Sequence, residues 1–261
     1  MKLLITGGSG YIAKSLHTAF YQLYDVTMIS RKDFDLTSYE AMSNFFEGKY
    51  FDVVIHCAVK GGSRLVKESF KDMDDNLSMY YNLLQHRSKY GKLIHFGSGA
   101  EFNSPESPYG LSKRVISKSI SEIDNFYDIR IYAVFDENEL DTRFIKSNIL
   151  RYLNNESMII HENKEMDFFY MKDLIKVVEY CIQTDQPYRS AIHCTYPNSY
   201  RLFYIANIIN NLDTHRVGIE IEQDNGTSYT GSFNDLVLSY IGLEQGIQET
   251  YNKIKETYAT N

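Results

Sequence analysis

The sequence predicts an α/β protein with a doubly wound parallel sheet, followed by a smaller C-terminal part. Short apolar runs alternate with amphipathic segments of helical length through the first half of the chain, and this alternation loosens after about residue 137. Strands that alternate with helices form parallel sheets whose two faces are covered by helices. We therefore expect one large sheet-based domain and a small cap built partly from returning segments.

The length and charge of the chain limit its class. It has 261 residues, with 27 Lys and Arg against 34 Asp and Glu, for a formal net charge of −7. This length suits one α/β unit with an appendage, and the acidic balance predicts no nucleic-acid partner. No apolar run approaches the roughly 18 residues of a membrane span, so we expect no membrane partner and a cytoplasmic location. Cys57, Cys181 and Cys194 lack metal-ligand and disulfide spacing, which predicts three buried thiols and no metal site.

The strongest local pattern stands at the N-terminus. The apolar run at residues 3–5 is followed by the segment TGGSGYIA (residues 6–13), a helix-like segment over 11–20 and a strand-like run over 25–30. This order is a βαβ unit of the length that binds dinucleotides in a Rossmann-type fold. The alternative is a purely structural turn.

The residue types in this turn suit a pyrophosphate. Gly7 and Gly10 permit a tight turn and a close approach of the backbone to the ligand, and Ala13 keeps the following helix near the sheet. The N–H groups and the positive dipole end of that helix, which begins with Tyr11 and Ile12, face the phosphate.

The remaining elements follow from periodicity. Further strand-like runs lie at residues 53–56, 93–96, 129–134, 158–161 and 191–195, and helix-like segments lie at 70–90, 109–127, 142–153, 172–183, 200–211 and 243–258. In the helix over 70–90, an apolar stripe is formed by Leu77, Tyr80, Tyr81 and Leu84. We expect residues 1–139 and 166–195 to form the dinucleotide-binding domain, and residues 140–165 and 196–261 the cap.

A tyrosine and a lysine one helical turn apart are candidates for acid–base chemistry. Tyr109 and Lys113 project from the same face of a predicted helix, and a neighbouring cation lowers a phenol's pKa toward neutrality. Such a tyrosine is a usable proton donor or acceptor. The same spacing recurs at Tyr251 and Lys255 in the amphipathic terminal helix, where it predicts only a solvated face.

The fourth predicted strand ends with a hydroxyl. Ser98 stands at the carboxyl end of that strand, the edge at which open α/β sheets bind ligands. Serine, Tyr109 and Lys113 are therefore expected to converge, although Ser98 alone is equally typical of a glycine-rich turn. The nearby Glu101 is more typical of a solvated carboxylate in a loop than of a second catalytic acid.

Cofactor choice is predicted from the end of the second strand. An acidic residue there would accept hydrogen bonds from the ribose hydroxyls of NAD, but Ser30 is followed by Arg31 and Lys32. Two cations suit a 2′-phosphate, so NADP(H) is favoured over NAD(H). The histidines at positions 56, 95, 161 and 193 show no metal-ligand spacing and are expected to be packed or surface residues.

These motifs, in this order, resemble the extended short-chain dehydrogenase/reductase (NAD-dependent epimerase/dehydratase) family, which acts largely on nucleotide-linked sugars. The resemblance runs from residue 3 to about 195 and includes HCAV (56–59), YGLSK (109–113), RIYAVF (130–135) and DFFYMKDL (167–174). Within the family, AVKGG (58–62) resembles the loop after the third strand in GDP-L-fucose synthases, which also carry a basic residue where RKD (31–33) stands.

The resemblance implies roles for individual residues. Ser98, Tyr109 and Lys113 match the catalytic residues, Arg151 matches an arginine that contacts the nucleotide diphosphate, and members are often homodimers through the helices corresponding to 70–90 and 109–127. The cofactor site would further include Asp35 and Leu36 beside the adenine, Cys57, Ala58 and Val59 after the third strand, and Tyr109 and Lys113, with Lys113 at the nicotinamide ribose. The substrate site would include Lys60, Ser98 and Gly99, and Arg143, Lys146 and Arg151. For the last three, the alternative is a solvated basic helix face. For Asp35, the alternative is the N-cap of the next helix.

The departures from this family pattern shape the expected reaction. GDP-L-fucose synthases epimerise two carbons with a cysteine and a histidine, but the matching positions are Gly99 or Ala100 and Arg143. Met166 replaces an arginine, Ala133 replaces an asparagine, and the loop from Ser98 to Tyr109 is short. We therefore expect reduction of a nucleotide-linked 4-keto-6-deoxy sugar by NADPH. The alternatives are a 4-epimerase that retains its cofactor and a non-catalytic NADP-binding regulator.

Overall fold

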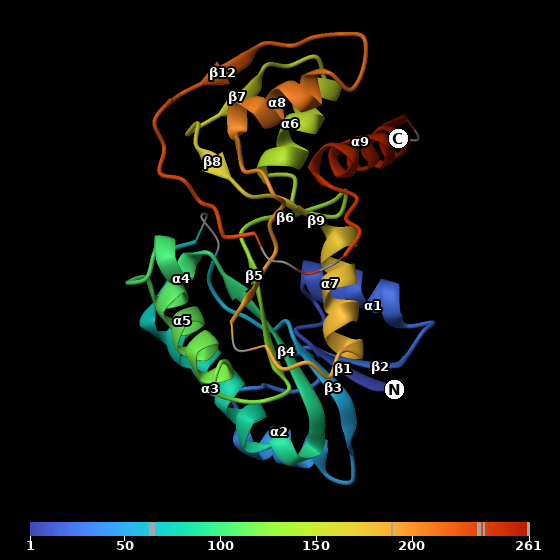
Figure 1. Ribbon diagram of the computed structural model, residues 1–261, viewed down its shortest axis with the longest axis vertical. Coiled ribbons are helices and arrows are strands. Elements are labelled where there is room, and N and C mark those ends of the chain that lie inside the picture. The colour runs from blue at the N-terminus through green and yellow to red at the C-terminus, as the bar shows by residue number, and fades with distance from the viewer. Residues whose placement is uncertain (63–65, 189, 234–235, 237, 260–261) are drawn as a thin grey trace. The chain divides into compact units, whose positions relative to one another are not determined.

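The computed structural model describes residues 1–62, 66–188, 190–233, 236 and 238–259, which form two compact units (Figure 1). The first unit comprises Met1–Arg130 and Val177–Ile192, and the second comprises Ile131–Lys176 and His193–Asn261. The chain therefore leaves the first unit, builds the smaller part of the second, returns to the first for Val177–Ile192, and ends in the second.

The first unit is built on a six-stranded sheet with the order β10-β5-β4-β3-β1-β2. Its strands are β1 (Lys2–Thr6), β2 (Asp25–Ile29), β3 (Phe51–His56), β4 (Tyr90–Ser98), β5 (Phe126–Ile131) and β10 (Ile192–His193). β1 pairs in parallel with both β2 and β3, and β3 pairs in parallel with β4. The strand order reverses between β1 and β3, which is where doubly wound sheets bind their ligands. The predicted Rossmann-type α/β class is confirmed.

Helices cover both faces of this sheet. They are α1 (Tyr11–Phe20), α2 (Tyr39–Phe46), α3 (Phe70–Gln85), α4 (Ala100–Asn103), α5 (Pro108–Ile120) and the short 3-10 helix η1 (Arg87–Lys89). Figure 1 shows α3 and α5 side by side on one face and α1 on the other. Leu3, Leu4 and Ile5 of β1 are fully buried, as expected for a parallel strand with helices on both sides.

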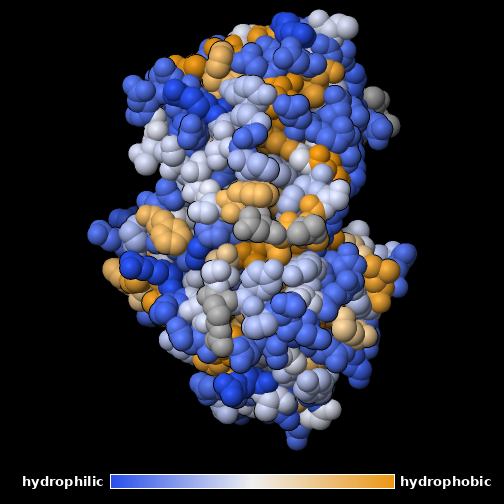
Figure 2. Space-filling view, viewed as in Figure 1, coloured by the Kyte–Doolittle hydropathy of each residue, from blue (hydrophilic) through white to orange (hydrophobic). Residues whose placement is uncertain are grey.

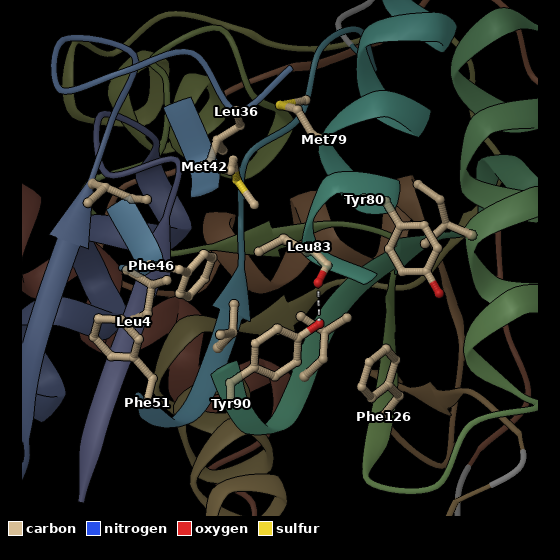
Figure 3. Close-up of a cluster of buried hydrophobic side chains, with 14 of the residues drawn as sticks. Leu4, Leu36, Met42, Phe46, Phe51, Met79, Tyr80, Leu83, Tyr90 and Phe126 are labelled. Atoms are coloured by element: carbon tan, nitrogen blue, oxygen red, sulfur yellow. Dashed lines mark hydrogen bonds between the residues drawn. The ribbon is translucent and has the colours of Figure 1, made fainter. Parts of the chain in front are cut away.

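One core cluster lies on the side of the sheet covered by α2 and α3 (Figure 3). It includes Leu4, Phe46, Tyr80 and Leu83, and the hydroxyl of Tyr90 donates a 2.9 Å hydrogen bond to the carbonyl oxygen of Leu83. Burial of each such apolar side chain stabilises the fold by about 2 kcal/mol. This cluster fixes α3 on the sheet.

The predicted apolar stripe of α3 is only partly correct. Tyr80 is buried and Leu77 and Leu84 pack against the core cluster, but the Tyr81 side chain is 42% exposed. Asn82 takes a buried place instead, because its side-chain amide donates to the carbonyl oxygen of Leu36 at 2.9 Å. A prediction based on apolar residues alone could not identify Asn82, because a polar side chain can be buried when its hydrogen bond is satisfied inside the core.

Three expected elements end earlier than their residues suggested. The helix expected over 70–90 ends at Gln85, and the helix expected over 109–127 ends at Ile120, before Asn125 adopts a left-handed φ of 64°. The strand expected over 129–134 breaks after Ile131, and β6 (Val134–Phe135) pairs with a different strand. A continuous apolar run shows burial but does not reveal a change of partner.

The second unit contains short strand pairs and helices. Its strands are β6, β7 (Met158–Ile160), β8 (Glu165–Met166), β9 (Phe169–Tyr170), β11 (Tyr200–Arg201) and β12 (Ile219–Ile221), and its helices are α6 (Phe144–Leu153), α8 (Leu202–Asn210), α9 (Leu243–Ala259) and the first part of α7 (Met171–Gln183). β6 pairs with β9, β7 with β12 and β8 with β11. Helices α6, α8 and α9 pack on one another.

Hydrophilic side chains predominate on the face shown in Figure 2, and hydrophobic side chains form small groups there. None of the helices within the described residues has the length and apolar character that crossing a bilayer requires.

Candidate active site

The glycine turn after β1 lies against the loop that follows β3. Gly7 has a φ of +72°, and a Cβ atom at this position would be 2.6 Å from the backbone nitrogen of Ala58. Only glycine permits both this conformation and this approach. The backbone nitrogen of Gly10 donates to the carbonyl oxygen of Gly7 at 2.8 Å, and α1 begins at the next residue, Tyr11. The turn and the first N–H groups of α1 therefore lie at the point where the strand order reverses.

The end of β2 presents two exposed cations. Arg31 and Lys32 are exposed, whereas the carboxylate of Asp33 accepts hydrogen bonds from the backbone nitrogen and the hydroxyl of Ser30, at 2.8 and 3.0 Å. These bonds lower the pKa of Asp33. Asp33 keeps its negative charge but bonds Ser30, so two exposed cations stand beside one carboxylate at this edge.

Asp35 and Leu36 follow this turn. The Asp35 carboxylate accepts two 2.9 Å hydrogen bonds from the backbone and hydroxyl of Thr37, so it shapes its own turn. Asp35 is not the N-cap of α2; Ser38 is, since its hydroxyl accepts a hydrogen bond from the backbone of Ala41. Leu36 is buried in the core cluster.

The loop after β3 is held from both sides. The backbone nitrogen of Ala58 donates to the hydroxyl of Thr6 at 3.3 Å, and the Asn76 side chain bonds both backbone groups of Lys60, at 2.8 and 2.9 Å. The ammonium of Lys60 forms an ion pair with Asp75. Cys57 is half-buried, and burial raises the pKa of its thiol, whereas Val59 is exposed.

Two further glycines bring this loop against Tyr109. Gly61 and Gly62 have φ of +82° and +74°, and a Cβ at Gly62 would be 2.9 Å from Cζ of the Tyr109 ring. Glu68 joins the two segments, because its carboxylate accepts from the backbone nitrogens of Gly62 and Tyr109 at 2.9 and 3.1 Å. The second of these bonds places negative charge at the N-terminus of α5, where the helix dipole favours it.

Lys113 contacts both the Tyr109 ring and the end of β4. The Lys113 ammonium lies 5.8 Å from the centre of the Tyr109 ring and donates a 2.5 Å hydrogen bond to the carbonyl oxygen of Phe96. Ser98, two residues further along β4, is buried, and its hydroxyl accepts from the backbone of Ala100 at 3.2 Å. Gly99, the next residue, is buried as well.

Burial changes the proton affinity of Lys113. It lowers the pKa of this ammonium from 10.5 to about 8, against the opposing influence of the carboxylates of Asp128 and Glu101. A lysine with this pKa still carries most of its charge at neutral pH. A cation beside a phenol stabilises the phenolate, so the arrangement supports proton transfer by Tyr109.

Glu101 is not the solvated carboxylate that its loop position suggested. It is 3% exposed and binds Arg130 at 2.6 Å, and it also accepts from the backbone nitrogen of Ser98 at 3.0 Å. Burial and the carboxylate of Asp128 raise the pKa of Glu101, while Arg130 opposes them. Gly97 makes room for this cluster, because a Cβ there would be 2.7 Å from a carboxylate oxygen of Asp128.

The sequence reasoning missed Asp128 and undervalued His95. His95 was expected to be merely a packed or surface residue, yet its ring lies 3.3 Å from the Lys113 nitrogen and 2.9 Å from a carboxylate oxygen of Asp128. The available signal was the presence of polar residues in two largely apolar runs, His95 at 93–96 and both Asp128 and Arg130 at 126–131. Buried polar residues require partners, so two such residues on core strands suggest a pair.

The cations proposed for the substrate diphosphate belong to the second unit. Lys146 lies in α6, where its ammonium pairs with Asp141 at 2.8 Å and donates to the carbonyl oxygen of Glu139. Arg151, later in α6, donates to the carbonyl oxygen of Ser157 at 3.1 Å. Arg143 is exposed and occupies the N-cap position of this helix.

The later histidines have local partners. His161 pairs with Glu222 at 2.8 Å, and His193 lies 2.9 Å from the hydroxyl of Tyr132. Across the part of the chain that the structure describes, no group of three or more His, Cys, Asp or Glu side chains is arranged to hold a metal ion.

Comparisons with known proteins identify the family. Residues 3–192 match the NAD dependent epimerase/dehydratase family, and the chain belongs to this family. It is 22% identical over 210 residues to CDP-abequose synthase from Yersinia pseudotuberculosis, a match that spans 71% of this chain and 74% of that protein.

Two solved structures show the same fold. A GDP-mannoheptose C4 reductase from Campylobacter jejuni with NADP bound has a TM-score of 0.81 and 16% identity, over 97% of this chain and 98% of that chain. The UDP-glucose 4-epimerase of Thermotoga maritima has a TM-score of 0.79 and 15% identity, over 99% of this chain and 100% of that chain. Structures of this fold hold NADP in some cases and NAD in others.

The predicted enzyme class is therefore confirmed. The chain is an NAD(P)-dependent enzyme of the extended short-chain dehydrogenase/reductase type, in a family whose members modify nucleotide-linked sugars.

Proposed function

We propose that this member of the NAD dependent epimerase/dehydratase family uses NADPH to reduce the carbonyl of a nucleotide-linked 4-keto-6-deoxy sugar to a hydroxyl. The observation that carries the proposal is that Lys113 contacts both the Tyr109 ring and the end of β4, beside the loops that follow β1 and β3. The fold shared with a GDP-mannoheptose C4 reductase that binds NADP supports it.

Three side chains would carry out the chemistry at the carbonyl. The Tyr109 hydroxyl gives a proton to the carbonyl oxygen, and the neighbouring Lys113 ammonium stabilises the phenolate that remains. The Ser98 hydroxyl donates a hydrogen bond to the same oxygen as negative charge develops on it. When bound, the reduced nicotinamide supplies the hydride.

The residues at the edge of the sheet fit a phosphorylated dinucleotide. The turn from Gly7 to Gly10 and the N-terminus of α1 at Tyr11 and Ile12 would hold the pyrophosphate, because N–H groups converge there and no Cβ intervenes. Arg31 and Lys32 would bind the 2′-phosphate, which favours NADP(H) over NAD(H).

The loops beside the turn would complete the cofactor site. Asp35 and Leu36 would border the adenine, and Cys57, Ala58 and Val59 would border the ribose side of the cofactor. These roles follow from the family pattern, and the contact of Gly7 with Ala58 supports the second of them.

The substrate diphosphate needs cations, and we rank the candidate cations by their exposure and by the ion pairs that they already form. Arg143 is exposed, whereas Lys146, Arg151 and Lys60 are paired with Asp141, Glu156 and Asp75. The pair of Arg151 with Glu156 is the longest of the three, at 3.4 Å. We therefore assign the main phosphate contact to Arg143 and a second contact to Arg151, with Lys60 and Gly99 near the sugar and Lys146 as a structural support of α6.

The larger organisation follows the same proposal. Residues 1–139 and 166–195 would bind the dinucleotide, and residues 140–165 and 196–261 would form the cap that binds the sugar nucleotide. The chain would act in the cytoplasm as a homodimer formed through α3 and α5, and the exposure of Phe70 and Tyr81 on α3 supports this surface.

A 4-epimerase is the second candidate. The shared fold with UDP-glucose 4-epimerase favours it, and the same three residues would serve both reactions. An epimerase must keep its oxidised or reduced cofactor through the cycle, so NAD retained after purification would favour this candidate over the reductase.

The test is NADPH oxidation with a panel of GDP-, CDP-, UDP- and dTDP-linked 4-keto-6-deoxy sugars. Turnover with one substrate that is lost in Tyr109→Phe and kept in the matched control Tyr251→Phe would support the reductase. Silence of the unsubstituted protein across the panel, with NADPH still bound, would overturn it in favour of the epimerase. Failure to bind either dinucleotide would overturn the cofactor site.

A further inference from the structure

A buried histidine and aspartate lie behind the candidate catalytic lysine. The Nε2 atom of His95 is 3.3 Å from Nζ of Lys113, and its Nδ1 atom is 2.9 Å from Oδ1 of Asp128. His95 is 1% exposed and Asp128 is 4% exposed. All three side chains belong to the first unit, on β4, β5 and α5.

The chemistry of the lysine decides the direction of these hydrogen bonds. An ammonium has donors only, so Nε2 of His95 must accept from Lys113 while the lysine is charged. The ring proton then lies on Nδ1 and is donated to the Asp128 carboxylate. Burial and the charge of Lys113 hold the pKa of His95 well below its usual range, which keeps the ring neutral and able to accept.

Asp128 is itself fixed by a second layer of side chains. The Ser117 hydroxyl donates a 2.8 Å hydrogen bond to Oδ2 of Asp128. The same hydroxyl accepts a 3.0 Å hydrogen bond from the Arg130 guanidinium. Arg130 binds Glu101 and lies over the Phe102 ring at 4.7 Å. The carboxylate facing His95 therefore has little freedom to turn away.

We propose that His95 and Asp128 are positioning residues for Lys113, which hold its ammonium at the end of β4 beneath the Tyr109 ring. The proposal rests on the function proposed above, in which Lys113 serves Tyr109. The hydrogen bonds to His95 and to the carbonyl oxygen of Phe96 use two of the three N–H donors of the ammonium. They fix the direction of the third.

The Asp128 carboxylate also sets how readily Lys113 keeps its proton. Among the described residues, the titratable groups around the ammonium are His56 at the end of β3, Cys57 after it, His95 on β4, Glu101 on α4, Tyr109 on α5 and Asp128 on β5. Among these groups, the carboxylates of Asp128 and Glu101 are the two whose negative charge favours the charged form of Lys113. Removal of the charge of Asp128 therefore makes the ammonium a stronger acid.

A cavity adjoins this cluster. Asp128, Ser117, Arg130 and Glu101 line a cavity of about 420 Å³ beside α5. Asp128, Arg130 and Glu101 are nevertheless only 4%, 7% and 3% exposed, so water has little access to their charged groups.

The direct test is the pKa of Lys113 in the protein without added cofactor, measured by NMR of ε-carbon-labelled lysine and assigned with Lys113→Met. We expect Asp128→Asn, which keeps the shape of the side chain, to lower this pKa by about 1. The matched control is Asp213→Asn, which removes the partner of Lys255 in the second unit. An unchanged Lys113 pKa in Asp128→Asn would overturn the proposal.

Turnover gives the second readout, with the two His95 variants compared. His95→Gln keeps a side-chain acceptor for the ammonium and His95→Leu does not, so we expect about tenfold more loss of kcat in His95→Leu, with the KM for NADPH nearly unchanged. Equal losses in both variants, with both folded by circular dichroism, would show a merely structural role and overturn the positioning. A lowered Lys113 pKa together with inactivity on every sugar would instead count against the proposed function alone.

Discussion

The chain carries the same tyrosine–lysine spacing twice, and the two copies have opposite surroundings. In α5, Lys113 is buried and Tyr109 is half-buried, whereas in α9 Tyr251 is 2% exposed and the Lys255 side chain is 53% exposed. The sequence reasoning expected the second pair to be a solvated face. That expectation was wrong for Tyr251, because α9 packs on α6 and α8 within the second unit and Tyr251 is buried there.

The charges around the two pairs differ as well. In α9, Asp213 binds the Lys255 ammonium at 2.7 Å and accepts from the Tyr251 hydroxyl at 3.1 Å. Burial raises the pKa of Tyr251, and the Asp213 hydrogen bond raises that of Lys255. In α5, burial instead lowers the pKa of Lys113 to about 8. An identical spacing therefore stands in two different settings: in α9 one carboxylate binds both the phenol and the ammonium, whereas in α5 the buried ammonium donates to the carbonyl oxygen of Phe96.

Replacement of each lysine by methionine should separate the two pairs most clearly. Lys113→Met removes the cation that stabilises the phenolate of Tyr109, so we expect kcat/KM to fall by about 100-fold or more. Lys255→Met removes an exposed ion pair and should leave kcat/KM unchanged. Steady-state kinetics on the substrate found in the panel would check both variants. Equal losses of kcat/KM would show that the two pairs do not differ in function.

Arg31 and Lys32 are the residues proposed to select the cofactor that the first pair would use. Arg31→Asp combined with Lys32→Ala should shift the ratio of KM values for NADPH and NADH by about tenfold to 100-fold toward NADH, because charge-assisted hydrogen bonds to the 2′-phosphate are lost. The control is Arg87→Asp with Lys89→Ala, which changes the same residue types before the amino end of β4. An unchanged ratio in the first variant would disprove the assignment of Arg31 and Lys32.

The pH dependence should report the first pair and not the second. The Lys113 ammonium has a pKa of about 8, so it loses its proton as the pH rises through that value. We expect log kcat/KM to be level below pH 8 and to fall above it by about tenfold per pH unit. A profile that stays level well above pH 8, measured with NADPH at a fixed saturation, would contradict the role of the charged lysine.

The smallest effect should appear in stability, at the second pair. Tyr251→Phe removes a buried hydroxyl that bonds Asp213, so we expect the free energy of unfolding to decrease by about 1 kcal/mol in urea denaturation. The hydrogen bond from Lys255 lowers the pKa of Asp213 to about 2. The interactions of the Asp213 carboxylate therefore stabilise the fold above pH 3.8, and this stabilisation is lost as the pH falls toward 2. A variant as stable as the parent at pH 7 would show that this hydroxyl is as well solvated in the unfolded chain.

Much of the first unit followed from local sequence. The glycine turn, the βαβ unit and the Tyr109–Lys113 spacing each depend on residues within one or two elements, and the structure contains all three. Periodicity failed where the partner changed, as at Ile131, since an apolar run looks the same on either side of such a change.

The sequence alone determined the fold class, the place of the nucleotide turn and the residue types at the candidate site, because these depend on short-range periodicity and backbone preference. Only the tertiary structure decided which tyrosine–lysine pair buries its lysine, that Glu101 is paired with Arg130, and that His95 and Asp128 stand behind Lys113. Those outcomes depend on contacts between residues 18 to 42 positions apart in the chain. Burial and charge pairing are set by such contacts, and no local pattern carries them.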